Sequence, residues 1–512
     1  MAALKRDPQW ELLQQHLDQL IRSGQQGSAR TLLLQTNFKQ LHRDDSAHFA
    51  DLARRLNMPK LMLQILRPIV RSEIVLRPPP SDRERALYAT ALSRLGVYDE
   101  AQDILDSLVG SSRPEVLLFQ AQHSMLQWAL EPAAASLTKY TVRADLSTYE
   151  RRVGLVNLAA CYVWNQQARL AGELLQKLLD DFKSEIESGQ EQHKLIYSYI
   201  IELAAELAIQ EKNYGKAQDL LTQAEALLAN SQSRYEFYAK KWKAILGLLA
   251  QPHNPQHLTE LRHIKSEGRK LAEWEVIRDC EFYEALALRD DELFLRVYLG
   301  TSHSSFRKRI KKMYQPDFAI PRAKVLRLDG DKKTGSRIFD FTKGCEQGGE
   351  KSLSQFPLLF RLLQILTEDL YRPAPIGSIA SRLYPDEYFN PLSSPQKAHQ
   401  VIFRLRQWLK ENEIPLEISM LNENYQLDAT GPYSIRVLRG QKKISKNEAL
   451  MERVKSQFTG RPFNSQDMAK TLMLSPRSTQ KFLSWAVKSK KILRLAAGRA
   501  SRYRLARTIS SR

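Results

Sequence analysis

Residues 83–108 read RERALYATALSRLGVYDEAQDILDSL, and this stretch sets the pattern for the first 300 residues. Two runs of helix-forming residues are separated at Gly96, a residue type that commonly ends a helix. Small side chains at Ala89 and Ala101 allow two helices to approach closely, and Tyr98 is placed to fill the space beside the turn. The stretch therefore predicts a pair of antiparallel helices joined by a short turn.

The same spacing recurs along the chain. At intervals of 34, 36 and 46 residues, the small position of the second helix is expected at Ala101, Ala135, Ala171 and Ala217. One unit departs from the pattern, because Leu130 and Pro132 replace the Gly and Tyr of the turn. These segments resemble tetratricopeptide repeats. The resemblance implies that residues 1–300 form a curved solenoid that binds a protein or peptide partner, and no single residue there is nominated as a contact.

The net charge of +20 is concentrated in the C-terminal part of the chain. Residues 1–300 carry 37 Lys and Arg against 39 Asp and Glu, whereas residues 301–512 carry 40 against 18. Residues 431–512 alone carry 20 basic and 3 acidic side chains. A segment with this excess attracts polyphosphate, so duplex DNA is the partner that it predicts. An acidic protein or a membrane surface would suit the same charge and stays open as an alternative.

Residues 447–512 are predicted to hold three helices and a basic hairpin. A helix over Asn447–Phe458 is followed by two short amphipathic helices, the first capped by Asn464 or Ser465 and the second by Ser475. The apolar face of the last helix is predicted to consist of Thr479, Leu483, Ala486 and Val487. In the hairpin, the residues expected to point inward are Leu493, Leu495, Tyr503 and Leu505.

The opposite face of that helix, together with the hairpin, carries the candidate DNA contacts. Cations and hydroxyl groups suit phosphates and base edges. The candidate DNA-binding residues are Arg477, Ser478, Lys481, Ser484, Lys488, Arg499, Arg502 and Arg504. The segment resembles the winged helix-turn-helix of MarR- and DeoR-like bacterial transcription regulators. The resemblance implies that the helix enters the major groove while the hairpin follows the phosphate backbone.

Residues 322–430 predict a second mixed domain. Alternation over 322–342 indicates a hairpin. Helices are expected over Leu358–Leu366, Ile376–Leu383 and Gln396–Leu409, and the segment closes with Tyr425-Gln426-Leu427. This order of elements resembles the OmpR/PhoB-type DNA-binding domain and implies that the last of the three helices reads DNA.

The polar face of that helix supplies a second set of candidate DNA contacts, Gln396, Lys397, Gln400 and Arg404. The expected wing at residues 420–424 reads MLNEN and is acidic and polar, whereas the wings of this family are usually basic. Either DNA binding or a docking role is therefore left open for this domain.

Sequence patterns typical of enzymes and metal sites are missing. There is no H-E-x-x-H, no complete P-loop and no G-x-S-x-G, and the three cysteines are far apart. We therefore expect no catalytic activity, no metal and no cofactor. No apolar run has the length of a membrane span or a signal peptide, which predicts a cytoplasmic protein without a membrane partner.

Together these patterns predict a mostly α protein, with a tetratricopeptide-like α-solenoid followed by two small α+β winged-helix domains. The expected boundaries are 1–300 for the array, 301–321 for a basic connector, 322–430 for the OmpR/PhoB-like domain, 431–446 for a basic linker and 447–512 for the last domain. The predicted function is DNA-binding transcriptional regulation. The alternatives are a protein-interaction scaffold of the PCI type, or RNA binding. The DNA target, the effector and homodimer formation are left open.

Overall fold

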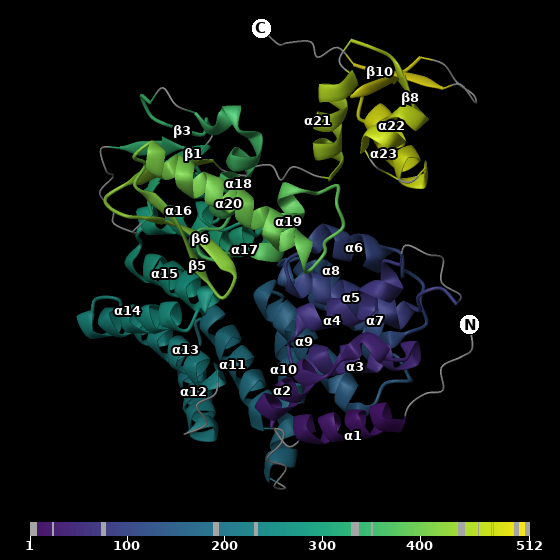
Figure 1. The fold of residues 1–512 in the computed structure, drawn as a ribbon. Coiled ribbons are helices and arrows are strands. Elements are labelled where there is room, and N and C mark those ends of the chain that lie inside the picture. Colours follow the sequence, from purple (N-terminus) through teal and green to yellow (C-terminus); the bar gives the residue numbers. More distant parts are fainter. Residues whose placement is uncertain are drawn as a thin grey trace.

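A computed structural model places a helical array first and two small α+β domains after it (Figure 1). The structure describes residues 8–22, 25–72, 78–187, 194–229, 234–328, 337–341, 343–349, 352–438, 446–458, 460–472, 474, 476–495 and 501–506. The predicted fold class, a mostly α chain with a tetratricopeptide-like solenoid followed by two small α+β domains, is confirmed. No helix in the described ranges has the length and apolar character needed to cross a membrane.

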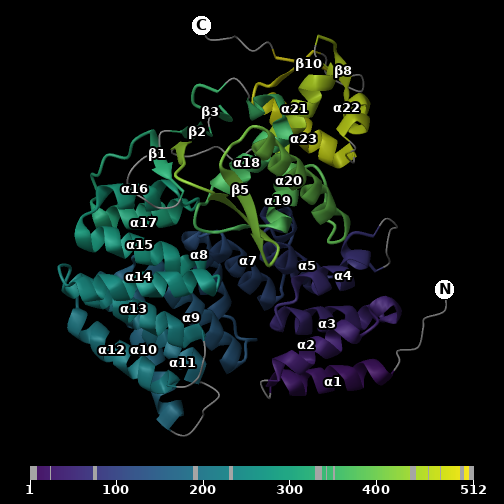
Figure 2. The ribbon, with the colours of Figure 1, turned by 60° about the vertical axis from the view of Figure 1, so that its left-hand side comes forward.

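The array consists of helices that pack in sequence order, each against its neighbours. Its helices are α1 (Pro8–Arg22), α2 (Gln26–Gln35), η1 (Phe38–Gln40), α3 (Arg43–Arg55), α4 (Pro59–Val70), α5 (Asp82–Arg94), α6 (Tyr98–Asp106), α7 (Pro114–Leu126), α8 (Leu130–Thr141), α9 (Thr148–Trp164), α10 (Ala168–Glu187), α11 (Lys194–Gln210), α12 (Tyr214–Leu228), α13 (Arg234–Ala250), α14 (Pro255–Lys270), α15 (Trp274–Leu288), α16 (Asp291–Leu299) and α17 (Ser304–Tyr314). The array curves from α1 round to α16, and the middle domain lies across its opening (Figures 1 and 2).

The turns of the array repeat a single backbone conformation. A residue with positive φ stands two positions before a helix start at Asn57, Gly96, Trp128, Gln166, Lys212, Ala272 and Arg289. The next N–H then donates to a carbonyl five residues back, as from Val97 to Leu92 at 2.9 Å. This is the hydrogen bond of a Schellman C-cap. Because Gly96 is the one glycine among these positions, the repeat is regular in the backbone and barely visible in the sequence.

The predicted small position is wrong in one unit. Ala101, Ala171 and Ala217 are fully buried, as expected, but Ala135 is exposed. The buried equivalent is Ala133, which is the fourth residue of α8 just as Ala101 is the fourth residue of α6. α8 begins at Leu130, 32 residues after the start of α6 at Tyr98, so the equivalent position lies two residues before the one expected from a spacing of 34.

The segment expected as a connector after residue 300 contains α17. Phe306, Ile310 and Tyr314 bury one face of this helix, and the ring of Tyr314 stacks on Phe294 of α16 with 4.1 Å between centroids. Lys308 and Lys312 lie on the other side, away from these contacts. Residues 304–314 are therefore the last helix of the array.

The middle domain extends from β1 to β7. Its elements are β1 (Ala323–Arg327), β2 (Ile338–Asp340), β3 (Cys345–Glu346), η3 (Leu353–Gln355), α18 (Pro357–Thr367), β4 (Ala374–Pro375), α19 (Ile376–Leu383), α20 (Ser393–Glu411), β5 (Leu416–Leu421), β6 (Asn424–Ala429) and β7 (Ser434–Leu438). The three predicted helices are confirmed, and β5 and β6 form the predicted polar hairpin in a sheet of order β4-β6-β5.

Two expectations for this domain are wrong. The predicted hairpin over 322–342 does not form, because β7 lies between β1 and β2 in a sheet of order β1-β7-β2-β3. β7 pairs antiparallel with β1 and parallel with β2. It comes from the stretch expected as a linker, so residues 434–438 are part of the domain core, with Ile435 fully buried.

The last domain is built from α21 (Lys446–Phe458), β8 (Phe463–Asn464), α22 (Ser465–Leu472), α23 (Pro476–Lys488), β9 (Ile492–Arg494) and β10 (Arg502–Leu505). Its sheet has the order β8-β10-β9. Asn464 caps α22 as predicted, since its Oδ1 accepts from the N–H groups of Gln466 and Asp467 at 2.8 and 2.9 Å. Ser475 lies outside the described residues.

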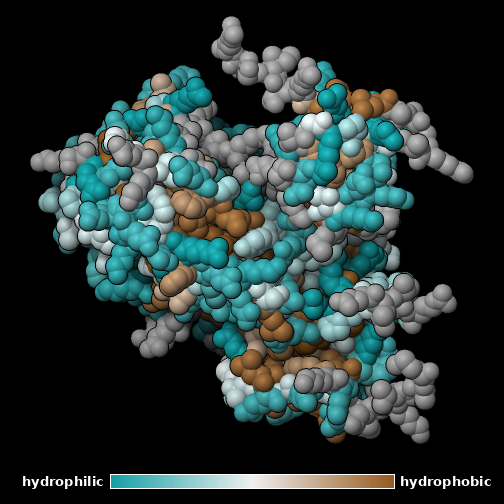
Figure 3. Space-filling model, turned by 45° about the horizontal axis from the view of Figure 1, so that its top comes forward, coloured by the Kyte–Doolittle hydropathy of each residue, from teal (hydrophilic) through white to brown (hydrophobic). Residues whose placement is uncertain are grey.

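The core of the last domain matches the predicted helix face but not the predicted hairpin. Thr479, Leu483 and Ala486 are buried. Leu493 and Leu495, expected to point inward, are 52% and 53% exposed, whereas Ile492 and Tyr503 are buried. Pairing of Leu505 with Ile492 sets this register and turns Leu493 outward. Figure 3 shows apolar surface at the outer end of this domain, between the two grey segments.

Candidate functional sites

The exposed side of α23 carries part of the predicted DNA-contact set. Lys481, Ser484 and Lys488 are exposed and lie three or four residues apart, on the side opposite the buried Leu483. Arg477 and Ser478 belong to the first turn of this helix, and their side chains fall outside the described part of the structure.

The hairpin supplies a second group of cations. Arg502 and Arg504 are exposed on β10, with the buried Tyr503 between them. Arg499 lies outside the described residues. In both ribbon views α23 lies on the side of the domain nearer the array and the sheet lies further away (Figures 1 and 2). The structure therefore brings each group together on its own element but separates the two groups along the domain.

On α20, Gln396, Lys397, Gln400 and Arg404 form one exposed face. Lys397 is already paired, with 2.6 Å between its Nζ and Oε2 of Glu387. Phe403 is 67% exposed beside Gln400 and Arg404. This face is thus less cationic than that of α23 and includes an aromatic ring open to solvent.

The middle domain is docked onto one end of the array. Gly96, in the α5–α6 turn, lies so close to α19 that an added Cβ would be 2.9 Å from Cβ of Ser378. Glu100 of α6 accepts from the N–H of Phe389 at 2.8 Å. At the tip of the β5–β6 hairpin, Glu423 forms an ion pair with Lys60 of α4, with 2.5 Å between Oε2 and Nζ. The wing of this domain therefore contacts protein.

The same domain reaches the other end of the array through the loop after α18. Asp369 accepts from the N–H and the hydroxyl of Ser302 at 3.3 and 3.0 Å and lies 3.6 Å from Arg278. Burial alone would raise the pKa of Asp369, but Arg278 and His303 hold it below its usual value. The hydroxyl of Tyr371 donates to Glu281 of α15. The middle domain thus bridges α4–α6 and α15–α17.

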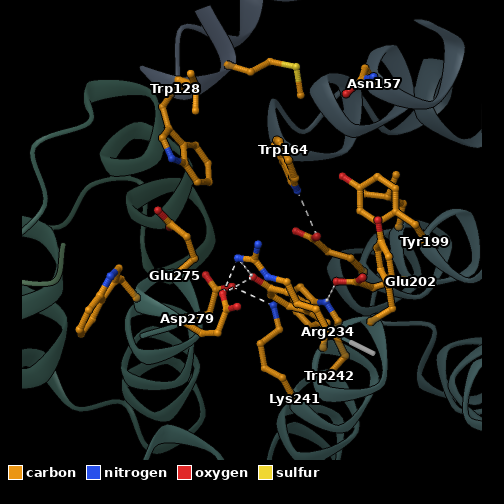
Figure 4. A pocket seen from close by; sticks show the side chains of 18 of the residues that line it. Trp128, Asn157, Trp164, Tyr199, Glu202, Arg234, Lys241, Trp242, Glu275 and Asp279 are labelled. Atoms are coloured by element: carbon orange, nitrogen blue, oxygen red, sulfur yellow. Dashed lines mark hydrogen bonds and ion pairs between the residues drawn. The ribbon is translucent and has the colours of Figure 1, made fainter. Parts of the chain in front are cut away.

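The concave side of the array contains a pocket of about 610 Å³. Its walls come mainly from the first helices of successive pairs, α5, α7, α9, α11, α13 and α15, and α17 and the loop after α18 close it. Trp128 and Trp164 form one part of the wall, with 5.7 Å between ring centroids (Figure 4). Arg372 brings the middle domain into the same wall.

Ion pairs cross the floor of this pocket between neighbouring helices. Asp279 of α15 binds Lys241 of α13 at 3.0 Å, and Glu206 of α11 binds Arg309 of α17 at 2.5 Å. Burial would lower the pKa of Lys241, but Asp279 outweighs it and raises that pKa. Burial would also lower the pKa of Arg309, but the carboxylate of Glu206 outweighs it and raises that pKa. The guanidinium of Arg309 is therefore charged.

Glu202 differs from these carboxylates. The indole N–H of Trp242 donates a hydrogen bond to its Oε1 at 3.0 Å (Figure 4). Within the described residues, no lysine or arginine forms an ion pair with it. Burial raises the pKa of Glu202 to about 7, although Lys241 opposes the shift. The pocket therefore contains a carboxyl group that can change its charge near neutrality.

None of the pocket residues was nominated from the sequence. Trp164, Glu202, Trp242 and Asp279 lie on four different helices and share no local motif. The signal that could have indicated them is the unusual number of charged and aromatic residues on the first helices of the pairs, where inter-repeat packing calls for apolar residues. In the parts of the chain that the structure describes, no group of His, Cys, Asp and Glu could hold a metal ion.

Comparisons with known proteins give a likeness to solved structures and no match to a family or a curated protein. Among solved structures, the chain is similar to the crystal structure of a Rap protein complexed with competence and sporulation factor, at 10% sequence identity and a TM-score of 0.39. That alignment covers 80% of this chain and 94% of the Rap chain.

Proposed function

We propose that this chain is a DNA-binding regulator in which the last domain contacts duplex DNA and the helical array binds a partner or effector. The observation that carries the proposal is the exposure of two cationic groups on the last domain, one on α23 and one on β10. Lys481 and Lys488 on α23 and Arg502 and Arg504 on β10 are all exposed, and none has a described carboxylate partner. Such a surface attracts phosphates, and a helix with one packed and one polar face suits the major groove.

The middle domain has a different part in this proposal. Its element order resembles the one expected for an OmpR/PhoB-type domain, but the tip of its β5–β6 hairpin contacts Lys60 and its α19 contacts the α5–α6 turn. We assign it to holding the two ends of the array together, while the exposed face of α20, with Gln396, Gln400 and Arg404, adds a weaker DNA contact.

The test is a titration of the full chain with duplexes selected from a random pool, repeated at several salt concentrations. We expect binding that weakens steeply with salt. The double variant Lys481→Ala/Lys488→Ala should bind at least tenfold less tightly. The matched control is Lys177→Ala/Lys216→Ala, which removes two exposed lysines from the array and should change nothing. Absence of binding to any duplex, or equal loss in both double variants, would refute the proposal. Competition with duplex RNA separates DNA binding from RNA binding.

A second candidate function is a protein-interaction scaffold. The ion pair between Lys60 and Glu423 favours it, because the β5–β6 hairpin of the middle domain contacts protein. The last domain could bind a protein partner in the same way. Under this reading the last domain docks an acidic protein through Lys481 and Lys488. Failure of duplex binding at low salt, together with loss of a protein complex in the double variant, would select the scaffold.

A further inference from the structure

In the described structure, Glu202 is the one acidic side chain of the concave pocket that forms no ion pair with a lysine or arginine. Three of its other acidic side chains are already paired: Glu206 with Arg309, Asp279 with Lys241, and Glu273 with Arg234. Glu275 is paired with Arg278 of the same helix. Glu202 receives only the indole N–H of Trp242 in the described structure. A half-buried carboxylate in this state is stabilised by any ligand that brings a positive charge.

The walls around Glu202 are aromatic. Tyr199 precedes it by one turn on α11, and Tyr235 of α13 lies against Tyr199 with 5.9 Å between ring centroids. Trp242 is on the same face of α13 and is 2% exposed. Faces of aromatic rings attract cations, and Trp242 already has one, since Nζ of Lys241 lies 3.9 Å from its ring centroid. That ammonium is bonded to Asp279, and its charge offsets only part of the effect of burial on Glu202, whose pKa stays raised.

We propose that this pocket binds an organic ammonium group, with Glu202 as its counter-ion and Tyr199, Tyr235 and Trp242 as its walls. An inorganic cation fits poorly, because the nearby carboxylates of Glu206 and Asp279 are already paired with Arg309 and Lys241 and are not free as oxygen ligands. The volume of about 610 Å³ is that of a site for a small molecule or a few peptide residues.

Two further features indicate what else the ligand carries. Arg94 and Arg372 line the same pocket, and neither forms a described ion pair with a carboxylate. A ligand with oxygen acceptors beside its ammonium, as in a peptide, would use them, whereas a free diamine would not. Because Arg372 belongs to the middle domain, the bound ligand would contact both the array and that domain.

This inference names the ligand class of the array and rests on the proposed function only for the expectation that the array binds an effector. It is tested by calorimetric titration of the full chain without DNA, so its outcome is independent of duplex binding. The probes are 1,5-diaminopentane, an end-blocked Gly-Gly-Lys-Gly-Gly peptide and the same peptide with acetylated lysine. Saturable binding of the diamine or the lysine peptide, but not of the acetylated peptide, is the expected result. The cationic probe with the higher affinity shows whether the ammonium belongs to a free diamine or to a lysine side chain of a peptide.

The variant Glu202→Gln should weaken binding of the cationic probes at least tenfold, since glutamine keeps the acceptor for Trp242 and removes the charge. Glu211→Gln, an exposed change just beyond the same helix, is the matched control and should bind as the native chain does. Tyr235→Leu, which removes one wall, should also weaken binding. No saturable binding of any cationic probe, or equal binding by Glu202→Gln, would overturn the proposal, provided that circular dichroism shows the variant to be folded.

Discussion

Gly377, in the first turn of α19, packs directly against the carbonyl oxygen of Leu95 at the end of α5. A Cβ at position 377 would collide with that oxygen, and both atoms belong to backbone that cannot easily move. The contact joins the middle domain to the array across residues that are far apart in sequence. It makes the position of the domain on the array sensitive to a single methyl group.

We therefore expect Gly377→Ala to lower stability by about 1–3 kcal/mol, the usual cost of overpacking a close contact. Thermal unfolding of the full chain measures it, and hydrogen exchange of the α5–α6 turn shows where the structure loosens. Gly215→Ala is the control, because a Cβ there meets nothing within 4 Å. That variant should be neutral or slightly stabilising. Equal stability of the two variants would contradict the close contact.

The corrected repeat position gives a second prediction. Ala133 is fully buried between α8 and its neighbours, while Ala135 on the same helix is exposed. Ala133→Leu should destabilise the chain by about 1–3 kcal/mol, whereas Ala135→Leu should stay within about 0.5 kcal/mol. Denaturant unfolding distinguishes them. A larger loss of stability in Ala135→Leu than in Ala133→Leu would contradict the structure and support the spacing expected from the sequence.

Acid should destabilise the array through His123. This side chain is 2% exposed, its Nδ1 lies 2.7 Å from the hydroxyl of Ser93, and burial lowers its pKa to about 4 from 6.5. The unfolded chain binds the proton more tightly, so the stability that neutral His123 contributes is present above pH 6.5 and is lost as pH falls towards 4. The loss should reach about 3 kcal/mol. In unfolding measured from pH 7.5 to 4.5, His123→Gln should show a flatter profile, and the exposed His48→Gln should follow the native chain.

Glu202 should have the opposite pH dependence. Because burial raises its pKa to about 7 from 4.5, the folded chain holds the proton more tightly than the unfolded chain. Its contribution to stability is therefore full below pH 4.5 and lost as pH rises through 7. Lys241, Glu206 and Asp279 face the same carboxyl and also act on it. Glu202→Gln should be more stable than the native chain by about 1–2 kcal/mol at pH 8, a value reduced for solvent access through the pocket, and equal to it near pH 4.5. A pH-independent difference would refute this assignment.

The cations of the hairpin and of α23 should affect DNA binding differently. Replacing Arg502 or Arg504 by alanine removes a phosphate contact, so binding should weaken on all duplexes and the salt slope should fall by about 0.9 per residue. Lys481→Ala should instead cost about 1–3 kcal/mol on the preferred duplex and relax its sequence preference. Titrations at four salt concentrations on preferred and scrambled duplexes separate the two effects. Identical behaviour of the three variants would mean that α23 does not read bases.

Local patterns in the sequence were enough to predict the element types. Helical spacing located α19 and α20, and the buried Leu483 and Ala486 confirm the predicted packed face of α23. The hairpin register was not predictable, because both Leu493 and Ile492 are apolar and only the pairing with Leu505 decides which one is buried. The concave pocket was not predictable either, since Glu202 and Asp279 line the same pocket only when the helices stack.

The sequence by itself determined the helical repeat character of the first 300 residues, the two mixed domains and the concentration of positive charge at the end of the chain, because these depend on composition and on spacing within one element. The tertiary structure decided which strands pair, where the array bends and which charges meet. β7 joins β1 and β2, Glu423 meets Lys60, and Glu202 accepts from the indole N–H of Trp242 with no described ion pair. Each of these depends on contacts between residues distant in sequence, whose free energy no local pattern encodes.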